Sequence, residues 1–99
     1  MSRQPIQPPI KPPSKPLVLI VDDDPDLTAL TEVHVRRWGY SAHSVGSAQQ
    51  LRRVLENQAP DVVLLDVMLG DADGTELVPE IHRRRPSVPV IMITRSTSV

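Results

Sequence analysis

The chain has 99 residues, with 11 Lys and Arg against 12 Asp and Glu, so its formal net charge is −1. It contains no cysteine, which excludes a disulfide framework and thiolate chemistry. No apolar run approaches the roughly 20 residues of a membrane span, and the N-terminus lacks the apolar segment of a signal peptide. We therefore expect a cytoplasmic protein with one small domain and no membrane contact.

Residues 1–16 differ in composition from the rest of the chain. They hold six of the eleven prolines, a charge of +3 and, besides Met1, only two large apolar residues, Ile6 and Ile10. Such a segment samples extended polyproline conformations and buries too little apolar surface to fold alone. We expect a disordered tail over residues 1–16 and a folded domain over residues 17–99. The folded part has a charge of −4, which argues against nucleic acid as a direct partner.

The folded part alternates between strand and helix patterns. Short apolar runs predict strands at residues 17–21, 61–66 and 88–93, and residues 40–45 are expected to form a short, weak strand. Between them, apolar residues three or four apart predict three helices. The resulting order, with a strand at each end and alternating helices, indicates an α/β fold with a parallel sheet and right-handed crossovers.

Capping residues mark where the helices begin. The first is expected to start at Pro25 with Asp23 or Asp24 as its cap, and the second is capped by Ser47. The third follows a turn at residues 70–74. The residues expected to face the core are Leu27, Leu30, Val33 and Trp38 in the first helix, Leu51, Val54 and Leu55 in the second, and Leu77, Val78 and Ile81 in the third.

Two of the predicted strands end in aspartate. The run at residues 17–21 leads into Asp22 and Asp23, and the run at residues 62–65 leads into Asp66. The carboxyl ends of parallel strands meet at one edge of a sheet, where ligands bind in open α/β folds. Clustered carboxylates repel one another unless a cation lies among them, so this arrangement predicts a divalent metal site.

Three strings carry a resemblance to a known family: LVLIVDDDPDL, then DVVLLDVMLGDADGTEL, then VPVIMIT. In order and spacing they resemble the receiver domain of two-component response regulators, over Leu17 to about Thr94. The resemblance implies a flavodoxin-like, doubly wound parallel sheet of order 2-1-3-4-5, here without the fifth strand and the last helix. It also implies a phosphoacceptor module rather than an enzyme, with at most self-phosphorylation and self-dephosphorylation chemistry.

The same resemblance implies roles for the residues at the strand ends. Asp66 would accept a phosphoryl group from a sensor histidine kinase or phosphotransfer protein, and Thr94 would sense that group by a hydrogen bond. Asp22, Asp23, Asp66 and the backbone carbonyl of Met68 would hold Mg²⁺, Asp22 through water. The chemistry agrees, because carboxylates form acyl phosphates and Mg²⁺ neutralises the opposing charges. A downstream output domain is a further possible partner.

A haloacid-dehalogenase-like phosphatase is one alternative interpretation. Asp22 and Asp24 fit the Asp-x-Asp pattern that ends its first strand, but Asp26 stands where that family has Thr or Val, and Asp66 is left unexplained. A calcium-binding loop that starts at Asp22 is a poorer match, because its sixth position is Leu27 rather than glycine.

A degenerate, non-phosphorylated interaction module is the other alternative, because the chain departs from the receiver pattern. Gly70 replaces a common proline, and Arg95 replaces a small residue beside Thr94. The lysine that the family carries on a fifth strand is not present before Val99. We expect the gene beyond Val99 to encode a helix and then an apolar strand ending in lysine. Without that strand, residues 88–93 form an exposed apolar edge.

Overall fold

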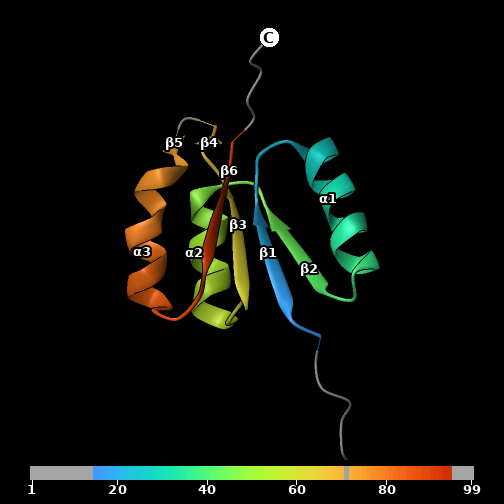
Figure 1. The fold of residues 1–99 in the computed structure, drawn as a ribbon. Coiled ribbons are helices and arrows are strands. Elements are labelled where there is room, and N and C mark those ends of the chain that lie inside the picture. The colour runs from blue at the N-terminus through green and yellow to red at the C-terminus, as the bar shows by residue number, and fades with distance from the viewer. Residues whose placement is uncertain (1–14, 71, 95–99) are drawn as a thin grey trace, which may run out of the picture.

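A parallel four-stranded sheet forms the centre of the computed structural model, which describes residues 15–70 and 72–94 (Figure 1). Its strands are β1 (Leu17–Val21), β2 (Ser41–Val45), β3 (Val62–Asp66) and β6 (Val90–Ile93). They lie in the order β2-β1-β3-β6, so β1 pairs with both β2 and β3. This order confirms the predicted α/β class and the first four positions of the family order.

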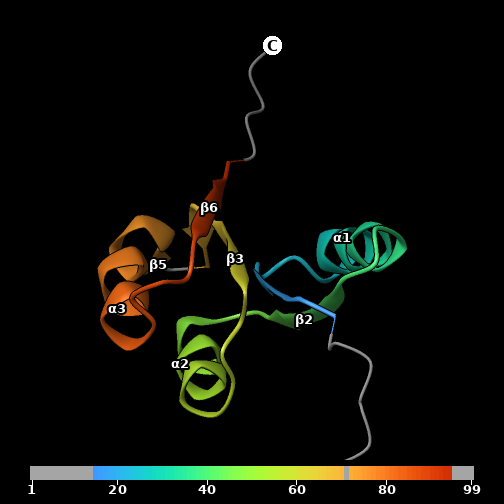
Figure 2. The same ribbon diagram turned by 60° about the horizontal axis from the view of Figure 1, so that its bottom comes forward.

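Three α-helices cover the two faces of this sheet (Figure 2). Helix α1 (Pro25–Arg37) lies on one face, and α2 (Ala48–Asn57) and α3 (Leu77–Arg84) lie on the other. Helices on both faces of a parallel sheet define a doubly wound fold. In residues 15–70 and 72–94, no helix is long and apolar enough to cross a membrane.

The helix starts follow the capping residues in the sequence. The Asp24 carboxylate accepts hydrogen bonds from two backbone N–H groups of the first turn of α1, at 3.0 and 3.2 Å, and Pro25 is the first helical residue. The Ser47 hydroxyl accepts a bond of 3.1 Å from the first turn of α2. Beyond the end of α1, Gly39 has a φ of +92°, which is a conformation that favours glycine.

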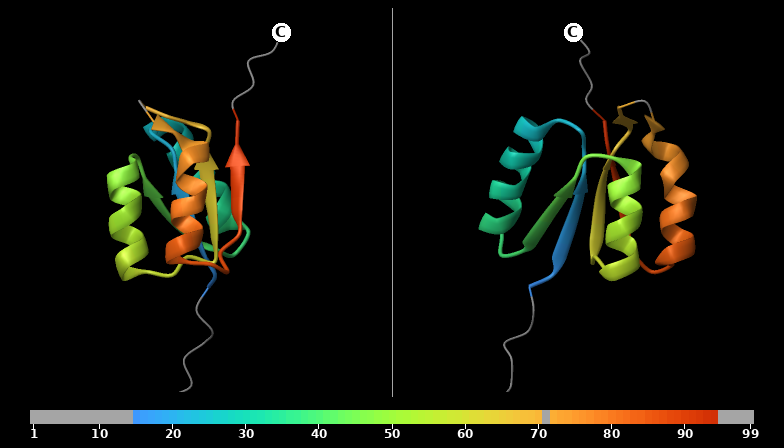
Figure 3. Two further views of the ribbon diagram at one scale, coloured as in Figure 1. Left: turned by 90° about the vertical axis from the view of Figure 1, so that its left-hand side faces the viewer. Right: turned by 180° about the vertical axis from the view of Figure 1, so that it is seen from behind.

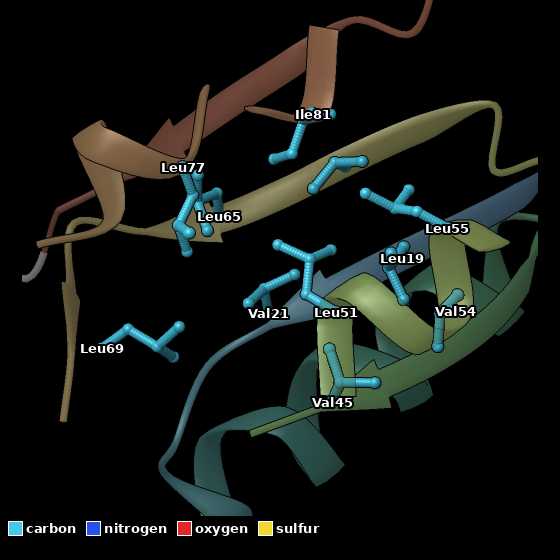
Figure 4. Packing of buried hydrophobic residues seen from close by; sticks show 11 residues of the cluster. Leu19, Val21, Val45, Leu51, Val54, Leu55, Leu65, Leu69, Leu77 and Ile81 are labelled. Carbon is cyan, nitrogen blue, oxygen red and sulfur yellow. The ribbon is translucent and has the colours of Figure 1, made fainter. Parts of the chain in front are cut away.

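The larger core lies between the sheet and the helices α2 and α3 (Figure 4). Leu19, Val63 and Leu65 of the sheet and Ile81 of α3 are each 0% exposed. Burial of one such side chain contributes about 1.5–3 kcal/mol to folding. The inward faces predicted for α2 and α3 are confirmed: Leu51, Val54, Leu55, Leu77 and Ile81 are buried, and Val78 packs against them.

Helices α2 and α3 lie side by side on their face of the sheet (Figure 3). The guanidinium of Arg52 donates two hydrogen bonds, of 2.6 and 3.1 Å, to the carboxylate of Glu80. A further bond of 2.7 Å runs from Arg85 to the backbone carbonyl of Leu55. These contacts tie α3, and with it the loop after β3, to the remainder of the domain.

The face of α1 that packs on the sheet is not the predicted one. Thr28 and Val35 are buried and Thr31 and Glu32 are half-buried, which is the i, i+3, i+4, i+7 spacing of one helix face. Three residues predicted to face inward are instead 55%, 50% and 71% exposed: Leu30, Val33 and Trp38. The prediction was wrong because the side of α1 that meets β1 and β2 carries mostly polar residues.

Two local features also differ from the sequence prediction. The expected turn at residues 70–74 belongs to a short antiparallel hairpin, formed by β4 (Met68–Leu69) and β5 (Ala72–Asp73). A single 3₁₀ turn, η1 (Gly74–Glu76), then precedes α3. The fourth long strand begins at Val90, two residues later than predicted.

The predicted boundary between a tail at residues 1–16 and a folded domain at residues 17–99 stays a prediction, because residues 1–14 and 95–99, Arg95 among them, lie outside the described residues. Lys15 and Pro16 are described. The carbonyl oxygen of Pro16 accepts a hydrogen bond of 2.9 Å from the N–H of Ser41. This bond extends the pairing of β1 and β2 by one position, so the chain is tied to the sheet from Pro16 onward.

Candidate functional site

Three carboxylates meet where β1 and β3 end. The strands pair in parallel with Val21 opposite Leu65, so the residues that follow, Asp22 and Asp66, come next to each other. One ligand oxygen from each of Asp22, Asp23 and Asp66 lies within 4.8 Å of the others. Asp22 and Asp66 are buried, at 9% and 3% exposure, whereas Asp23 is exposed. The sequence prediction that these residues gather at one sheet edge is confirmed.

Backbone hydrogen bonds hold Asp22 in place. Its N–H donates to the carbonyl of Val45 at 3.0 Å, which continues the pairing of β1 with β2. Its carboxylate accepts a bond of 2.9 Å from the N–H of Asp24, and Asp24 in turn caps α1. The loop that carries Asp23 is therefore fixed at both ends, between a buried strand and a helix start.

Asp66 is held by the loop that follows β3. Its carboxylate accepts a hydrogen bond of 3.0 Å from the N–H of Met68. The N–H of Val67 donates to the carbonyl of Ile93 at 3.1 Å, and the Val67 carbonyl accepts from Gly74 at 2.7 Å. A Cβ on Gly74 would overlap the backbone oxygen of Asp66, so this close approach of two backbones requires glycine.

A pocket of about 320 Å³ opens over the carboxylates, and its lining residues are Asp23, Asp66, Met68, Gly70 and Thr94. Thr94, which directly follows β6, therefore reaches the same pocket as the acidic residues. Gly70 has a φ of +56°, and a Cβ there would lie 3.6 Å from a carboxylate oxygen of Asp23. The glycine thus keeps one wall of the pocket free of a side chain.

The donor set of this pocket suits a hard divalent cation. Carboxylate oxygens are the ligands that Mg²⁺ and Ca²⁺ prefer, and Mg²⁺ takes one or two carboxylates together with water or phosphate oxygens. Among the described residues, the cluster holds aspartates alone, without the histidine that zinc sites commonly use. The cluster could hold one such ion, and the pocket leaves open space beside it.

Sequence reasoning missed the role of Gly74. The neighbouring Asp73 lies in the turn expected at residues 70–74, and its carboxylate accepts hydrogen bonds from the hydroxyl and the N–H of Thr75, at 2.6 and 2.9 Å. The hydroxyl of Thr75, and then its N–H, lower the pKa of Asp73. The signal available in the sequence was the pair Asp73-Gly74, which follows shortly after the strand that ends at Asp66.

The family of response regulator receiver domains matches residues 18–99. This chain belongs to that family. Receiver domains are the phosphoacceptor modules of two-component systems rather than classical enzymes. No residue role follows from the match alone, so the individual roles are treated below as proposals.

Curated relatives are longer than this chain. The probable transcriptional regulatory protein TcrX of Mycobacterium tuberculosis is 33% identical over 82 residues, which cover 83% of this chain and 35% of TcrX. The response regulator protein PilR of Pseudomonas aeruginosa is 37% identical over 81 residues, which cover 82% of this chain and 18% of PilR. The matched region thus spans about a third or less of these relatives.

Solved structures show the same fold. A CheY-like receiver domain from Methanospirillum hungatei has a TM-score of 0.79 and 32% identity, over 87% of this chain and 69% of that one. The response regulator MaeR was solved bound to beryllium trifluoride. It is 26% identical to this chain, with a TM-score of 0.74, and the match covers 84% of this chain and 70% of the MaeR chain. A response regulator from Burkholderia pseudomallei contains a phosphorylated aspartate and a calcium ion. It is 17% identical to this chain, with a TM-score of 0.78, and the match covers 85% of this chain and 49% of that one.

Proposed function

We propose that this domain accepts a phosphoryl group on Asp66, in a Mg²⁺-dependent reaction with a sensor histidine kinase or a phosphotransfer protein. The observation that carries the proposal is the convergence of Asp22, Asp23 and Asp66 within 4.8 Å beneath an open pocket. The beryllium trifluoride complex of MaeR supports it, because that group stands in for a phosphoryl group. The metal ion and phosphoaspartate of the Burkholderia protein are consistent with the same chemistry.

The proposal assigns Asp66 as the nucleophile. One of its carboxylate oxygens forms a bond to phosphorus while the bond from phosphorus to the donor nitrogen breaks, and the departing imidazole takes up a proton. The strand end and the N–H of Met68 keep the carboxylate in position for this step. Among the three carboxylates, Asp66 is the most buried and also lines the pocket, so an incoming phosphoryl group reaches it from one side.

Asp22, Asp23, Asp66 and the backbone carbonyl of Met68 are the groups proposed to hold Mg²⁺, with Asp22 acting through water. A bound Mg²⁺ would neutralise the charges that otherwise keep a carboxylate and a phosphoryl group apart. Asp23, the exposed member of the cluster, is the side chain best placed to reach an ion in the open pocket. Thr94, which also lines this pocket, is proposed to donate its hydroxyl hydrogen to a phosphoryl oxygen.

Intact-mass spectrometry after incubation with acetyl phosphate and Mg²⁺ tests this function. The full chain should gain the mass of one phosphoryl group, and a chelator should prevent the gain. Asp66→Asn should abolish it, and Asp23→Ala should nearly do so. Asp26→Asn is the matched control, because Asp26 is exposed on α1 and does not belong to the carboxylate cluster.

The outcomes also separate the alternative functions. Phosphorylation that is lost in Asp22→Asn and kept in Asp66→Asn would contradict the assignment and favour the phosphatase interpretation. A correctly folded chain that binds Mg²⁺ and never gains a phosphoryl group, from acetyl phosphate or from a phosphohistidine donor, would favour the non-phosphorylated interaction module.

A further inference from the structure

Strand β2 forms one edge of the sheet, because its only neighbouring strand within the described residues is β1 (Figure 1). The family order 2-1-3-4-5 also places this strand at the edge. The edge is therefore the same whether or not further strands follow β6. The outer side of an edge strand presents backbone N–H and C=O groups to which another strand can bond. Strand β2 is thus a candidate interaction surface.

Alternate residues of β2 bond to the β1 side. The N–H of Ser41 and the carbonyl of Val45 form hydrogen bonds of 2.9 and 3.0 Å with the residues that flank β1. In a regular ladder, the residues between those that bond the neighbouring strand direct their N–H and C=O groups to the opposite side. Ala42 and Ser44 therefore present their backbone groups at the outer edge of the sheet.

Two side chains close this edge on either side of Ser44. The guanidinium of Arg36 donates a hydrogen bond of 3.4 Å to the carbonyl of Ala42. The side-chain oxygen of Gln50 accepts a bond of 2.7 Å from the N–H of Gly46. The N–H and carbonyl of Ser44 are the outward pair between these two bonds. A single residue that presents both groups is matched by one residue of an antiparallel strand, which exchanges two hydrogen bonds with it.

A pocket of about 230 Å³ opens beside Ser44. Val45 packs in the core with α2 and α3, so His43, two positions earlier, lies on the same face of the sheet. Within residues 15–70 and 72–94, neither His43 nor Arg53 forms an ion pair, whereas Arg52 is paired with Glu80. The residues that line the pocket are His43, Ser44, Val45, Gln50, Arg53 and Val54.

The polar side chains of this pocket are able to donate hydrogen bonds. The guanidinium of Arg53 offers N–H groups in the fork that matches a carboxylate. The oxygen of the Gln50 amide already accepts from the backbone, so its NH₂ group is left to donate. The imidazole of His43 also carries an N–H group. Among the described residues, no Asp or Glu lines the pocket, so it suits a carboxylate group.

We propose that β2 binds a short antiparallel strand of a partner protein, and that the pocket holds an acidic side chain of that strand. The residue opposite Ser44 exchanges two backbone hydrogen bonds with it and points to the α1 face of the sheet, as the Ser44 side chain does. The residues before and after it point to the α2 face, where an Asp or Glu meets Arg53 and His43. Main-chain bonds supply affinity and the pocket supplies specificity, as in other cases of strand addition.

Charge distinguishes this partner from two other segments that reach the same edge. Residues 1–14 contain Arg3 and Lys11 but no Asp or Glu, so they bring no carboxylate to the pocket. A second copy paired through its own β2 has the sequence SAHSV there, which is also without an acidic residue. Such a pair would instead place a second His43 beside Arg53. The pocket therefore favours an acidic, extended segment of a different protein.

NMR titration of the isotope-labelled 99-residue chain with a synthetic peptide tests the proposal. The probe is acetyl-Thr-Val-Glu-Thr-Glu-Val-Thr-amide, in which glutamate flanks the central threonine. One control peptide has lysine in place of both glutamates, and another has an N-methyl group on the central threonine, which removes the donor to the Ser44 carbonyl. Arg53→Gln tests the pocket. Arg37→Gln is its matched control, because Arg37 is exposed and does not line the pocket.

The glutamate peptide should shift the amide resonances of β2, that of Ser44 most, and should bind about tenfold more tightly than the lysine peptide. The N-methylated peptide should bind as weakly as the lysine peptide. Arg53→Gln should weaken binding of the glutamate peptide by about tenfold, and Arg37→Gln should leave it unchanged.

Three outcomes would overturn the proposal. The first is that the amide resonances of β2 do not move at millimolar concentrations of the glutamate peptide. The second is equal affinity for the glutamate and lysine peptides, or equal affinity of wild type and Arg53→Gln for the glutamate peptide. The third is a shift of the β2 resonances that grows with protein concentration in the absence of peptide, which would assign the edge to a second copy of the chain.

Discussion

Gly74 and Asp66 are packed backbone against backbone at the entrance to α3. A Cβ on Gly74 would overlap the carbonyl oxygen of Asp66 and would lie 3.2 Å from the carbonyl oxygen of Val67. Backbone atoms cannot move aside as the tip of a flexible side chain can. The absence of a side chain at Gly74 therefore helps to set the position of the proposed phosphoacceptor.

Gly74→Ala should consequently destabilise the domain, by about 1–3 kcal/mol as for other overpacked sites. Gly46→Ala is the matched control, because the nearest atoms to its Cβ lie at 3.7 Å, an ordinary contact distance. Urea unfolding followed by circular dichroism measures both variants. A free energy of unfolding that is unchanged in Gly74→Ala would show that the loop after β3 can relax without cost.

Mg²⁺ affinity should depend on the carboxylate cluster and on no other acidic group nearby. Asp23→Ala and Asp66→Asn each remove a proposed ligand, and Asp22→Ala removes a group proposed to act through water. We expect each change to weaken Mg²⁺ binding by about tenfold or more. Isothermal titration calorimetry gives the affinities, with Asp26→Ala as the control that should bind as the wild type does. Wild-type affinity in Asp23→Ala would remove the metal from the proposed mechanism.

Two valines of α1 allow a test of the helix face that contacts the sheet. Val35 is 4% exposed and packs with Val18 and Ile20, whereas Val33 on the same helix is 50% exposed. Val35→Ala should lower the free energy of unfolding by about 1–3 kcal/mol. Val33→Ala should change it by no more than about 0.5 kcal/mol. Equal effects in thermal or urea unfolding would mean that α1 is rotated relative to the sheet.

The contact between α2 and α3 should make stability sensitive to acid. The hydrogen bond from Arg52 lowers the pKa of Glu80, with smaller contributions from the charges of Arg52, Arg84 and Arg83. A carboxyl whose pKa is lower in the folded state stabilises the fold above its unfolded pKa of about 4.3. That stabilisation is lost as the pH falls through the lower, folded pKa.

Melting temperatures across the acidic range test this linkage. Glu80→Gln should melt below the wild type at pH 7, and the two should converge as the pH falls well below 4.3, the approximate pKa of a free glutamate. Glu56→Gln is the control, since Glu56 is exposed and lies 3.6 Å from its partner Arg84. A gap between Glu80→Gln and wild type that is independent of pH would show that the charge of Glu80 is not what stabilises the contact.

The sheet and the place of the site were predictable because their signals are local. The strands β1, β3 and β6 are short apolar runs in the sequence. Parallel strands that lead into Asp22 and end in Asp66 must present these residues at one edge of the sheet. The starts of α1 and α2 were marked by their capping residues, Asp24 and Ser47. Thr94 was placed at the site by the family resemblance and not by any pattern in its own neighbourhood.

The orientation of α1 and the packing at Gly74 could not be predicted from the same signals. On α1 the apolar residues Leu30 and Val33 point away from the sheet, while Thr31 on the contacting side is polar, so hydrophobic periodicity indicates the wrong face. The contact of Gly74 with Asp66 depends on the path of the β4–β5 hairpin, which has no periodic signature. Both features follow from tertiary packing.

Locating the phosphoryl group on the chain is the most direct test of the proposed function. After incubation with acetyl phosphate and Mg²⁺, borohydride reduction converts an aspartyl phosphate to homoserine, which peptide mass spectrometry can place in the sequence. Phosphorylation of Asp66 predicts homoserine at position 66 and at no other aspartate. Homoserine at Asp22 or Asp23, or an acid-stable phosphate on a serine or threonine, would contradict it.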